Sequence, residues 1–500
     1  MAEQEETQAE KAPEEAQVEE LSLLDQLLSK IDTALPEKKE ERDQIGTAIG
    51  HLLDAVAKSA ERPERVDANL IDVYIAELDK KMSAQLDEVL HNEKFQQMES
   101  AWRGLYFMVN RTNFQSNIQV EILDVSKQEL AEDFQEVGDP LEGGLFVHTY
   151  TQAYDQYGAD PVSLMIANYQ FDSGPQDVEL MRNVADVAAA AHAPFIASAG
   201  PQFFGMESFE DLNKVTQLEP IMDSPAFLNW QSFRESENSR YVGLTLPEFL
   251  LRLPYGEDTV KVKGFNYSED VKAEEHGKYL WGNAAFAFAA NVNRSFADFG
   301  WPVNIIGPQS GGRVEDLPLH VYDIGEGMQA TKKPLEVTIP DMKERDYAEH
   351  GFIPLLVHES KKTEGCFFSA YSTQKPKEYD DDAATANSRL SARLPYMMLV
   401  SRLSHYLRVI QRDTLGQMVN ASDVQANLDR WIKQYVSGPN PRSEQLKAQR
   451  PLQAARVDVQ ESPDKPGVFD VQLYVTPHYQ AEEFNIELSL VAEMPEARGG

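Results

Sequence analysis

Cysteine, basic charge and long apolar runs are all scarce in this 500-residue chain. A single cysteine, Cys366, cannot form an intrachain disulfide, so the fold must rely on its core, as in proteins of the reducing cytoplasm. The 46 Lys and Arg against 82 Asp and Glu leave a formal net charge of −36, which argues against nucleic acid or an anionic membrane as a partner. The most apolar stretches, 184–200 and 279–292, are interrupted by Asp186 and His192 or fall short of the ~20 residues of a spanning helix. No direct membrane insertion is expected.

Motifs for catalysis and metal binding are also missing. The chain contains no G-x-x-x-x-G-K-[ST], no G-x-S-x-G and no H-E-x-x-H. The glycine-rich stretch Gly307–Arg313 lacks phosphate-loop spacing and is expected to be a plain loop, and Cys366 a small core residue. A run of acidic residues fits a solvated helix start better than a cation site. It comprises Glu378, Asp380, Asp381 and Asp382.

Two alternatives to a non-enzymatic assembly protein are open at this point. One is an α/β enzyme that uses the acidic run, or His358 with Glu359, in an unrecognised site. A two-histidine metal site formed by His350 and His358 is conceivable, but nothing else in the sequence supports it. The other is a soluble scaffold or chaperone adaptor.

The apolar periodicity predicts an α/β fold with mixed sheets flanked by helices, a helical N-terminal region and a C-terminal β-hairpin. Strand, helix and strand at 161–171, 177–193 and 194–200 suggest parallel strands that are covered on both faces. Further strands are expected at 117–125, 241–246, 302–307, 334–339, 351–357 and 366–372, and further helices at 278–299, 383–412 and 422–436. The hairpin is expected to pair 468–475 with 482–491.

The N-terminus combines an acidic tail with an apolar helix. Residues 1–20 carry eight Glu against one Lys and no aromatic residue, so we expect them to be disordered. A helix three turns long then follows at 21–32, and an isolated helix of that length is marginal in water. It must therefore pack on the core or bind another protein. Its apolar residues are Leu21, Leu23, Leu24, Leu27, Leu28 and Ile31.

The region 383–460 is basic within this acidic chain. It contains eleven Arg or Lys and five Asp or Glu, a local charge of +6. One interpretation is internal neutralisation of the acidic fold, and the other is a docking face for an acidic partner protein.

Three long blocks resemble a known family. They are "LNWQSFRESENSRYVGLTLPEFLLRLPYG" from Leu228, "YLWGNAAFAFAANVNRSFADFGWPVNIIGPQSGG" from Tyr279, and the stretch from Glu344 to Val409 that begins "ERDYAEHGFIPLLVHESKK". They are similar to the large subunit of the contractile sheath of the type VI secretion system, the TssC/VipB family. The resemblance runs from about Leu21 to Pro495.

The resemblance implies a tail-sheath-like structural protein with no enzymatic activity and no cofactor. It implies assembly in the bacterial cytoplasm with a small sheath subunit (TssB/VipA-like) and neighbouring copies of the chain, on a baseplate and around an inner tube of Hcp-like hexamers. Contraction would drive the tube and its effectors outward, and a Clp-type AAA+ ATPase (ClpV-like) would then disassemble the sheath. The expected organisation is a tail at 1–20, an ATPase-recognition helix at 21–32, a linker and helical region at 33–110, an α/β body at 111–380, and a tube-docking and strand-exchange region at 381–500.

The resemblance also assigns roles to residues near both ends. The leader helix at 21–32 would be the segment that the ATPase engages. A tube-contacting helix is expected within 430–456, where Arg442, Lys447 and Arg450 would face an acidic patch of the inner tube. The last strand would pair with a neighbouring subunit through the segment that carries Phe484, Ile486, Leu488 and Leu490.

Overall fold

The computed structural model describes residues 47, 51, 68–215, 217–272, 275–325, 328–357, 360–414, 420–439, 441, 443–461, 469–478 and 480. The chain divides into two compact units, Met1–Lys81 and Met82–Gly500, and the description below concerns the second. The expected leader helix and the strand at 482–491 lie outside the described residues. Within the described part, no helix is both long and apolar enough to cross a membrane.

Two long helices confirm the predicted helical region before residue 110. α3 spans Ala68–Leu90 and α4 spans Glu93–Asn110. Asn92 separates them, and its side chain accepts a hydrogen bond from Lys94 N at 3.1 Å, which caps α4. α4 packs on α10 (Ala284–Phe299) through Gly104, where a Cβ atom would lie 2.5 Å from the Phe286 ring.

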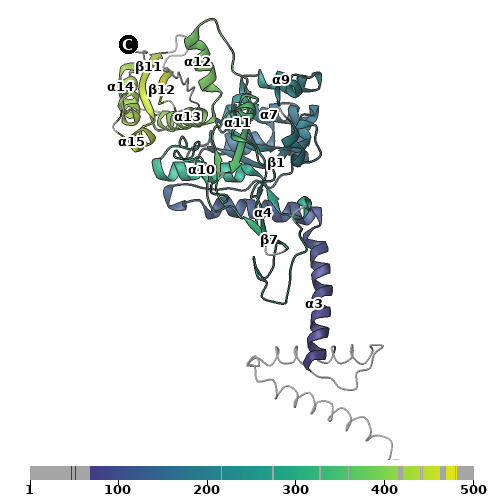
Figure 1. Ribbon diagram of the computed structural model, residues 1–500. Helices are drawn as coiled ribbons and strands as arrows, with labels where there is room; N and C mark the ends of the chain where they lie inside the picture. The colour runs from purple at the N-terminus through teal and green to yellow at the C-terminus, as the bar shows by residue number, and fades with distance from the viewer. Residues whose placement is uncertain are drawn as a thin grey trace, which may run out of the picture. The chain divides into compact units, whose positions relative to one another are not determined.

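A six-stranded sheet forms the centre of the molecule, in the order β1-β2-β3-β9-β10-β6 (Figure 1). The first four strands are parallel, and β10 is antiparallel to both of its neighbours. The strands are β1 Met165–Phe171, β2 Phe195–Ala199, β3 Val242–Leu246, β6 Arg313–Val314, β9 Phe352–Val357 and β10 Gly365–Phe367.

Helices cover both faces of this sheet, which explains why its inner strands β2 and β3 are buried along their whole length. Along β2, Phe195, Ala197 and Ala199 join the core cluster that contains α7 (Pro175–Ala191). Ile196, between them, joins the cluster that contains α10 on the other face. The predicted strand–helix–strand unit and its parallel pairing are therefore confirmed.

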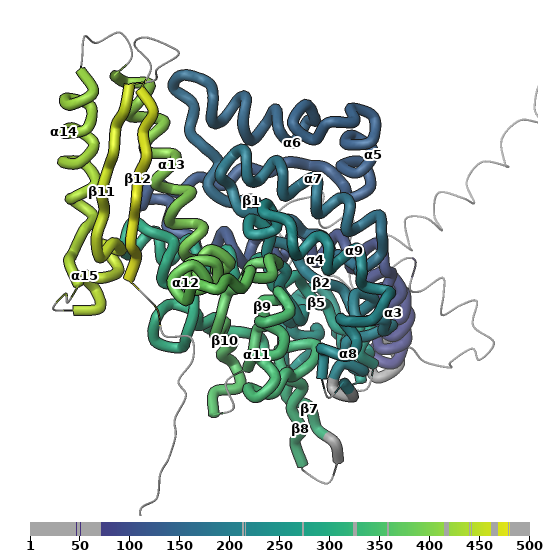
Figure 2. Tube along the Cα trace, turned by 90° about the horizontal axis from the view of Figure 1, so that it is seen from above, coloured from purple at the N-terminus to yellow at the C-terminus, as the bar shows by residue number. Residues whose placement is uncertain are grey.

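The C-terminal region forms a third core beside the sheet. In Figure 2, α14, β11 and β12 lie together at one side, next to α13. α13 belongs to both parts, because Leu394 and Met398 pack in the sheet core while Leu399 and Leu403 pack in the C-terminal core. The elements are α12 Asp382–Ser391, α13 Leu394–Thr414, α14 Ala421–Ile432, α15 Glu444–Gln449, β11 Leu452–Glu461 and β12 Phe469–Pro477.

The described C-terminal hairpin pairs β12 with a strand that was not expected, and the expected partner at 482–491 lies outside the described residues. The strand expected at 468–475 is present as β12, but it pairs antiparallel with the preceding strand β11, with Val457 opposite Leu473. Residues 452–461 belong largely to the basic segment, and they also carry a period-two pattern that places Val457 and Val459 on the core side.

Three other expected strands are not strands in the structure. The segments 302–307 and 334–339 make only the isolated bridges Ile306–Gly311 and Phe249–Leu335. Leu335, Val337 and Ile339 alternate with polar residues because their side chains pack on the core. The period of two therefore reflects side-chain packing and not the hydrogen bonds of a β-sheet. The segment 117–125 has no strand partner among the described residues.

Shorter elements complete the body. The β7–β8 hairpin extends from its lower end in Figure 2. These elements are α5 Lys127–Val137, α6 Gly144–Phe146 with a π-helical continuation Val147–Gln152, α8 Glu219–Met222, α9 Leu228–Arg234, α11 Asp341–Glu349, β4 Phe249–Leu250, β5 Trp281–Gly282, β7 His320–Gly325 and β8 Met328–Lys332.

Candidate functional site

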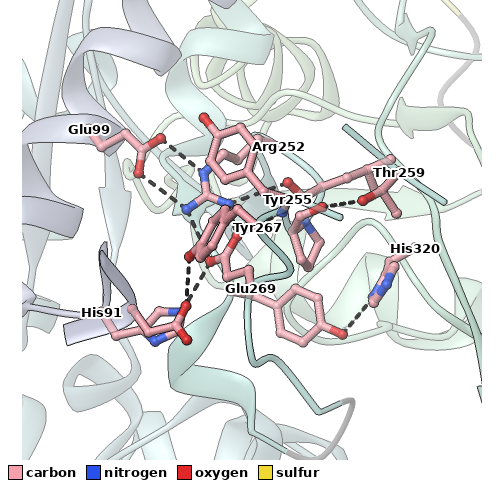
Figure 3. Close-up of polar contacts among 12 residues, drawn as sticks. His91, Glu99, Arg252, Tyr255, Thr259, Tyr267, Glu269 and His320 are labelled. Atoms are coloured by element: carbon pink, nitrogen blue, oxygen red, sulfur yellow. Dashed lines mark hydrogen bonds and ion pairs between the residues drawn. The ribbon is translucent and has the colours of Figure 1, made fainter. Parts of the chain in front are cut away.

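A buried network of charges joins the N-terminal helices to the body (Figure 3). The Arg252 guanidinium lies between two carboxylates. It donates from Nε to Glu99 Oε1 at 2.9 Å and from Nη1 to Glu269 Oε2 at 2.7 Å. Glu269 is also 3.1 Å from His91 Nε2, and it accepts a hydrogen bond from the Tyr255 backbone N–H at 2.9 Å. The network therefore connects residues more than 150 positions apart in the sequence.

Further contacts fasten the same helices to this loop. The Tyr267 hydroxyl donates to Asp87 Oδ1 on α3 at 2.6 Å. On α4, Arg103 pairs with Glu99 and donates to the Tyr255 hydroxyl at 2.8 Å. These bonds hold the end of α3 and the start of α4 against the 252–269 loop.

The chemistry of the network is structural. Burial alone would lower the pKa of Arg252, but the hydrogen bonds and charges of Glu269 and Glu99 outweigh it and raise that pKa. Burial and the bond to Asp87 raise the pKa of Tyr267 well above its usual range. Arg252 and Tyr267 therefore each keep one charge state near neutral pH, which suits both of them to anchoring.

A second polar cluster lies beside β4. Gln170 Nε2 donates to Glu248 Oε1 at 2.7 Å, while Glu336 Oε1 lies 3.1 Å from His276 Nε2 and Glu210 Oε1 lies 3.4 Å from His276 Nδ1. Burial and the nearby charge of Glu336 raise the pKa of Glu248 to about 8. A carboxyl group with such a pKa titrates near neutrality, but the described residues hold no group of three or more His, Cys, Asp or Glu that could bind a metal ion.

The candidate catalytic residues from the sequence have structural roles where they are described. Asp381 caps α12 by accepting a hydrogen bond from Ala383 N at 3.2 Å, so the acidic run is a helix start. Gly311 is required because a Cβ atom there would lie 1.9 Å from the Asn304 carbonyl oxygen. Burial raises the pKa of Cys366 to about 12, which leaves its thiol unreactive. His358 and Glu359 lie outside the described residues.

Five basic residues of 383–460 form ion pairs within the chain, three of them with acids that the local charge of +6 already counts. The ion pairs are Arg389–Glu378, Arg408–Asp155, Lys433–Asp429, Lys447–Glu444 and Arg456–Asp458. The Arg402 guanidinium stacks on the Phe296 and Tyr406 rings. These contacts support the internal-neutralisation interpretation for this part of the segment.

The expected docking residues do not share one helix. The range 430–456 contains the end of α14, the six-residue α15 and the first half of β11, so α15 is the helix within it that could carry the expected tube contact, which stays a prediction. Lys447 lies on α15, and Arg450 is an exposed residue that follows it. Arg442, the leader residues 21–31 and the strand residues 484–490 lie outside the described part of the chain.

The residues of the Arg252 network were not singled out from the sequence. His91, Glu99, Arg252 and Glu269 follow no short motif, and their separations of 17 to 178 positions carry no periodic signal. The sequence does hint at a buried cation, because Arg252 is a lone basic residue within the apolar block "LPEFLLRLPYG".

Two family models of known proteins match this chain, one over the sheet-containing body and one over the C-terminal region. A family model described as "EvpB/VC_A0108, tail sheath N-terminal domain" matches residues 72–374, and one described as "tail sheath gpW/gp25-like domain" matches residues 383–494. The chain is 39% identical over 466 residues to the "Type VI secretion system sheath protein TssC1" of Pseudomonas aeruginosa, which covers 93% of each protein.

Solved structures of contractile injection machines are more distant neighbours. A chain of the anti-feeding prophage baseplate aligns with 75% of this chain and 83% of its own length, at 12% identity and a TM-score of 0.35. A chain of the contracted anti-feeding prophage sheath aligns with 63% of this chain and 67% of its own length, at 11% identity and a TM-score of 0.31.

Proposed function

The chain belongs to the TssC/VipB family, the large sheath subunits of the type VI secretion system, and from this premise we propose how it works. It pairs with a small sheath subunit (TssB/VipA-like), and the pairs stack helically around a tube of Hcp-like hexamers, starting from a baseplate in the cytoplasm. Contraction of this lattice propels the tube. The family is one of structural proteins, so the work comes from a free-energy difference between two lattices and not from an active site.

One observation carries this proposal: the match to a sheath subunit extends over 93% of the chain and includes both tail sheath domains. A helical lattice needs unlike, complementary surfaces on each subunit, because its contacts never close into a ring. A body held together by buried charge pairs such as Arg252–Glu269 is suited to move as a rigid unit when the lattice rearranges.

The proposal is tested by assembly. We expect coexpression of the chain with its small sheath subunit to produce long hollow tubules in negative-stain electron microscopy, and the chain alone to produce none. Discrete particles under both conditions would contradict the sheath assignment and favour a scaffold or adaptor. Addition of the tube protein should increase tubule length, because the tube templates the lattice.

We further propose that a ClpV-like ATPase recognises the leader helix at 21–32. The support is its sequence, an apolar stripe behind an acidic tail, which suits binding of a helix in a groove. Replacing Leu24, Leu27, Leu28 and Ile31 with Ser should leave tubule assembly intact and abolish ATPase-driven disassembly, measured by light scattering. Insoluble or unassembled protein from this variant would show instead that the helix belongs to the core.

A further inference from the structure

Two glutamates lie opposite each other where the chain returns from the β7–β8 hairpin to the body. Leu335, which follows β8, makes an isolated antiparallel bridge with Phe249 of β4. Residues at equal distances on either side of an antiparallel bridge are also opposite each other, so Glu248 lies directly across from Glu336. The backbone agrees, because Glu336 N donates to the Glu248 carbonyl oxygen at 2.9 Å. Like charges at opposite positions of two strands destabilise their pairing.

Neither carboxyl group of this pair is fully hydrated. The Glu336 side chain is 10% exposed, and its Oε2 atom is buried with no hydrogen-bond partner among the described residues. Glu248 is half-buried, and its Oε1 accepts a hydrogen bond from the neutral amide of Gln170. A buried carboxylate oxygen without a donor is costly, and it is most costly when a second carboxylate lies beside it.

The cations near the pair lie on the Glu336 side. His276 lies between Glu336 and Glu210, with its Nε2 atom 3.1 Å from Glu336 Oε1 and its Nδ1 atom 3.4 Å from Glu210 Oε1. Lys332 Nζ, at the end of β8, is 3.3 Å from the same Nδ1 atom. Burial lowers the pKa of Lys332, although the charges of Glu210 and Glu336 act against it. The next charged groups are Lys127 and Asp177, which pair with each other at 2.8 Å beside the Gln170 backbone.

We propose that Glu248 and Glu336 hold one proton between them, and that loss of this proton releases the return strand of the β7–β8 hairpin from β4. While one carboxyl group is neutral, the two side chains do not repel each other. When both are ionised, like charges face each other across the bridge.

The bridge is a weak point of the hairpin's attachment. Besides the bond from Glu336 N, it contains one other backbone hydrogen bond, from Leu250 N to the Pro334 carbonyl oxygen at 2.7 Å. The hairpin itself projects from the body (Figure 2), so few contacts oppose its release. This device belongs to the chain alone and does not depend on the proposed function.

The direction of the pH effect follows from the raised pKa of Glu248. When the bridge is open, Glu248 releases its proton at its ordinary pKa of 4.5, whereas burial and the charge of Glu336 raise that pKa to about 8 when the bridge is closed. The closed bridge therefore binds the proton more tightly than the open one. Its stability should fall as pH rises from 4.5 to 8, and it should change little above that range.

Hydrogen exchange of the full chain measures the opening of the bridge. The protection of the Leu250 and Glu336 amides, relative to their intrinsic exchange rates, should fall at least tenfold between pH 6.5 and pH 9. In Glu248→Gln, whose side chain imitates the neutral acid, the protection should stay constant. Glu257→Gln is the matched control, because it changes a glutamate that is 87% exposed, and it should behave like the wild type. A wild-type loss of protection in Glu248→Gln would overturn the proposal.

Two further variants separate the carboxyl pair from its surroundings. Glu336→Gln removes the same repulsion from the other side, so it should also keep its protection, even if Glu248→Gln folds poorly. If His276→Gln abolishes the loss of protection while Glu248→Gln and Glu336→Gln keep it, the histidine senses pH and the proposal is wrong.

Infrared spectroscopy detects the shared proton directly. At pH 7 the wild-type chain should show the absorption of a protonated carboxyl group that is missing from Glu248→Gln and from Glu336→Gln. Identical spectra of the three proteins in this region would show that both glutamates are ionised at pH 7, and would overturn the proposal.

Discussion

At the scale of single residues, this protein depends on charged and polar groups that are buried with their partners. Arg252 and Glu269 are both buried and bonded to each other at 2.7 Å. Removing one partner of such a pair leaves the other charge buried without compensation, a loss of about 3–5 kcal/mol in other proteins. Residues of this kind maintain the shape of the body, and none of them needs to react.

His405 provides a prediction at this scale. It is buried in α13 and donates from Nε2 to the Ala191 carbonyl oxygen of α7 at 3.0 Å. Burial lowers the pKa of His405 to about 4, and the charges of Arg402 and His192 act in the same direction against the pull of the Ala191 bond. The unfolded chain binds this proton at about pH 6.5, so the free energy of unfolding should fall as pH decreases from 6.5 towards 4, by about 2 kcal/mol at pH 5.

The measurement compares thermal unfolding at pH 7.5 and pH 5. In His405→Gln, whose amide can still donate to Ala191, the drop in melting temperature should be smaller than in the wild type. His148→Gln, which replaces an exposed histidine, serves as the control and should behave like the wild type. An unchanged acid sensitivity in the His405 variant would contradict the prediction.

At the scale of elements, the C-terminal β11–β12 pair explains how a strand could link subunits. In the described part of the chain, β12 pairs with β11 on one side and with no strand on the other. An edge of this kind accepts a further strand through backbone hydrogen bonds. The family resemblance and this free edge together support the proposal that segments containing 484–490 are exchanged between neighbouring subunits.

Proline tests this strand exchange. Ile486→Pro or Leu488→Pro removes one backbone donor each, so we expect heterodimers to survive and tubules to be lost or shortened severely. Ile486→Val keeps the donor and the β-branched shape, and it should assemble normally. Tubules of normal length from both proline variants would rule out a linking role for this strand.

At the scale of the whole molecule, charge is unevenly distributed. The chain carries −36 overall, yet 383–460 carries +6, and five of its basic residues pair with acids of the same chain. Exposed pairs contribute only about 0–1 kcal/mol each, but a helical lattice repeats any contact with the tube along its length. Lys447 is one of these five through its pair with Glu444, and we propose that it faces an acidic patch on the inner tube together with Arg442 and Arg450.

Charge reversal tests this contact. Arg442, Lys447 and Arg450 changed together to Glu should leave heterodimers folded but should abolish co-purification of the tube, or yield empty contracted sheaths. Reversal of Lys261, Lys263 and Arg345, which lie outside the C-terminal region, gives the same change in net charge and should not affect the tube. A lowered melting temperature with normal tube binding would assign the three residues to internal neutralisation instead.

Patterns in the sequence were enough to predict the class of fold, the parallel strand–helix–strand unit and the long helices. These features depend on the spacing of apolar residues and on apolar content, and both can be read from a short stretch of sequence. The three blocks that resemble the family, such as Leu228–Gly256, were also sufficient to indicate it. The family could be inferred from these blocks without knowing which residues are in contact in the folded chain.

The pairing of segments could not be predicted in this way, because it depends on the tertiary structure. Period two at 117–125, 334–339 and 452–461 is similar in sequence, yet the first has no strand partner among the described residues, the second forms one isolated bridge, and the third is a full strand. The Arg252 network likewise unites α3, α4 and a loop about 150 residues later. The physical reason is that alternation records which side of a segment is apolar, whereas backbone pairing and charge pairing depend on neighbours that are distant in the chain or belong to another subunit.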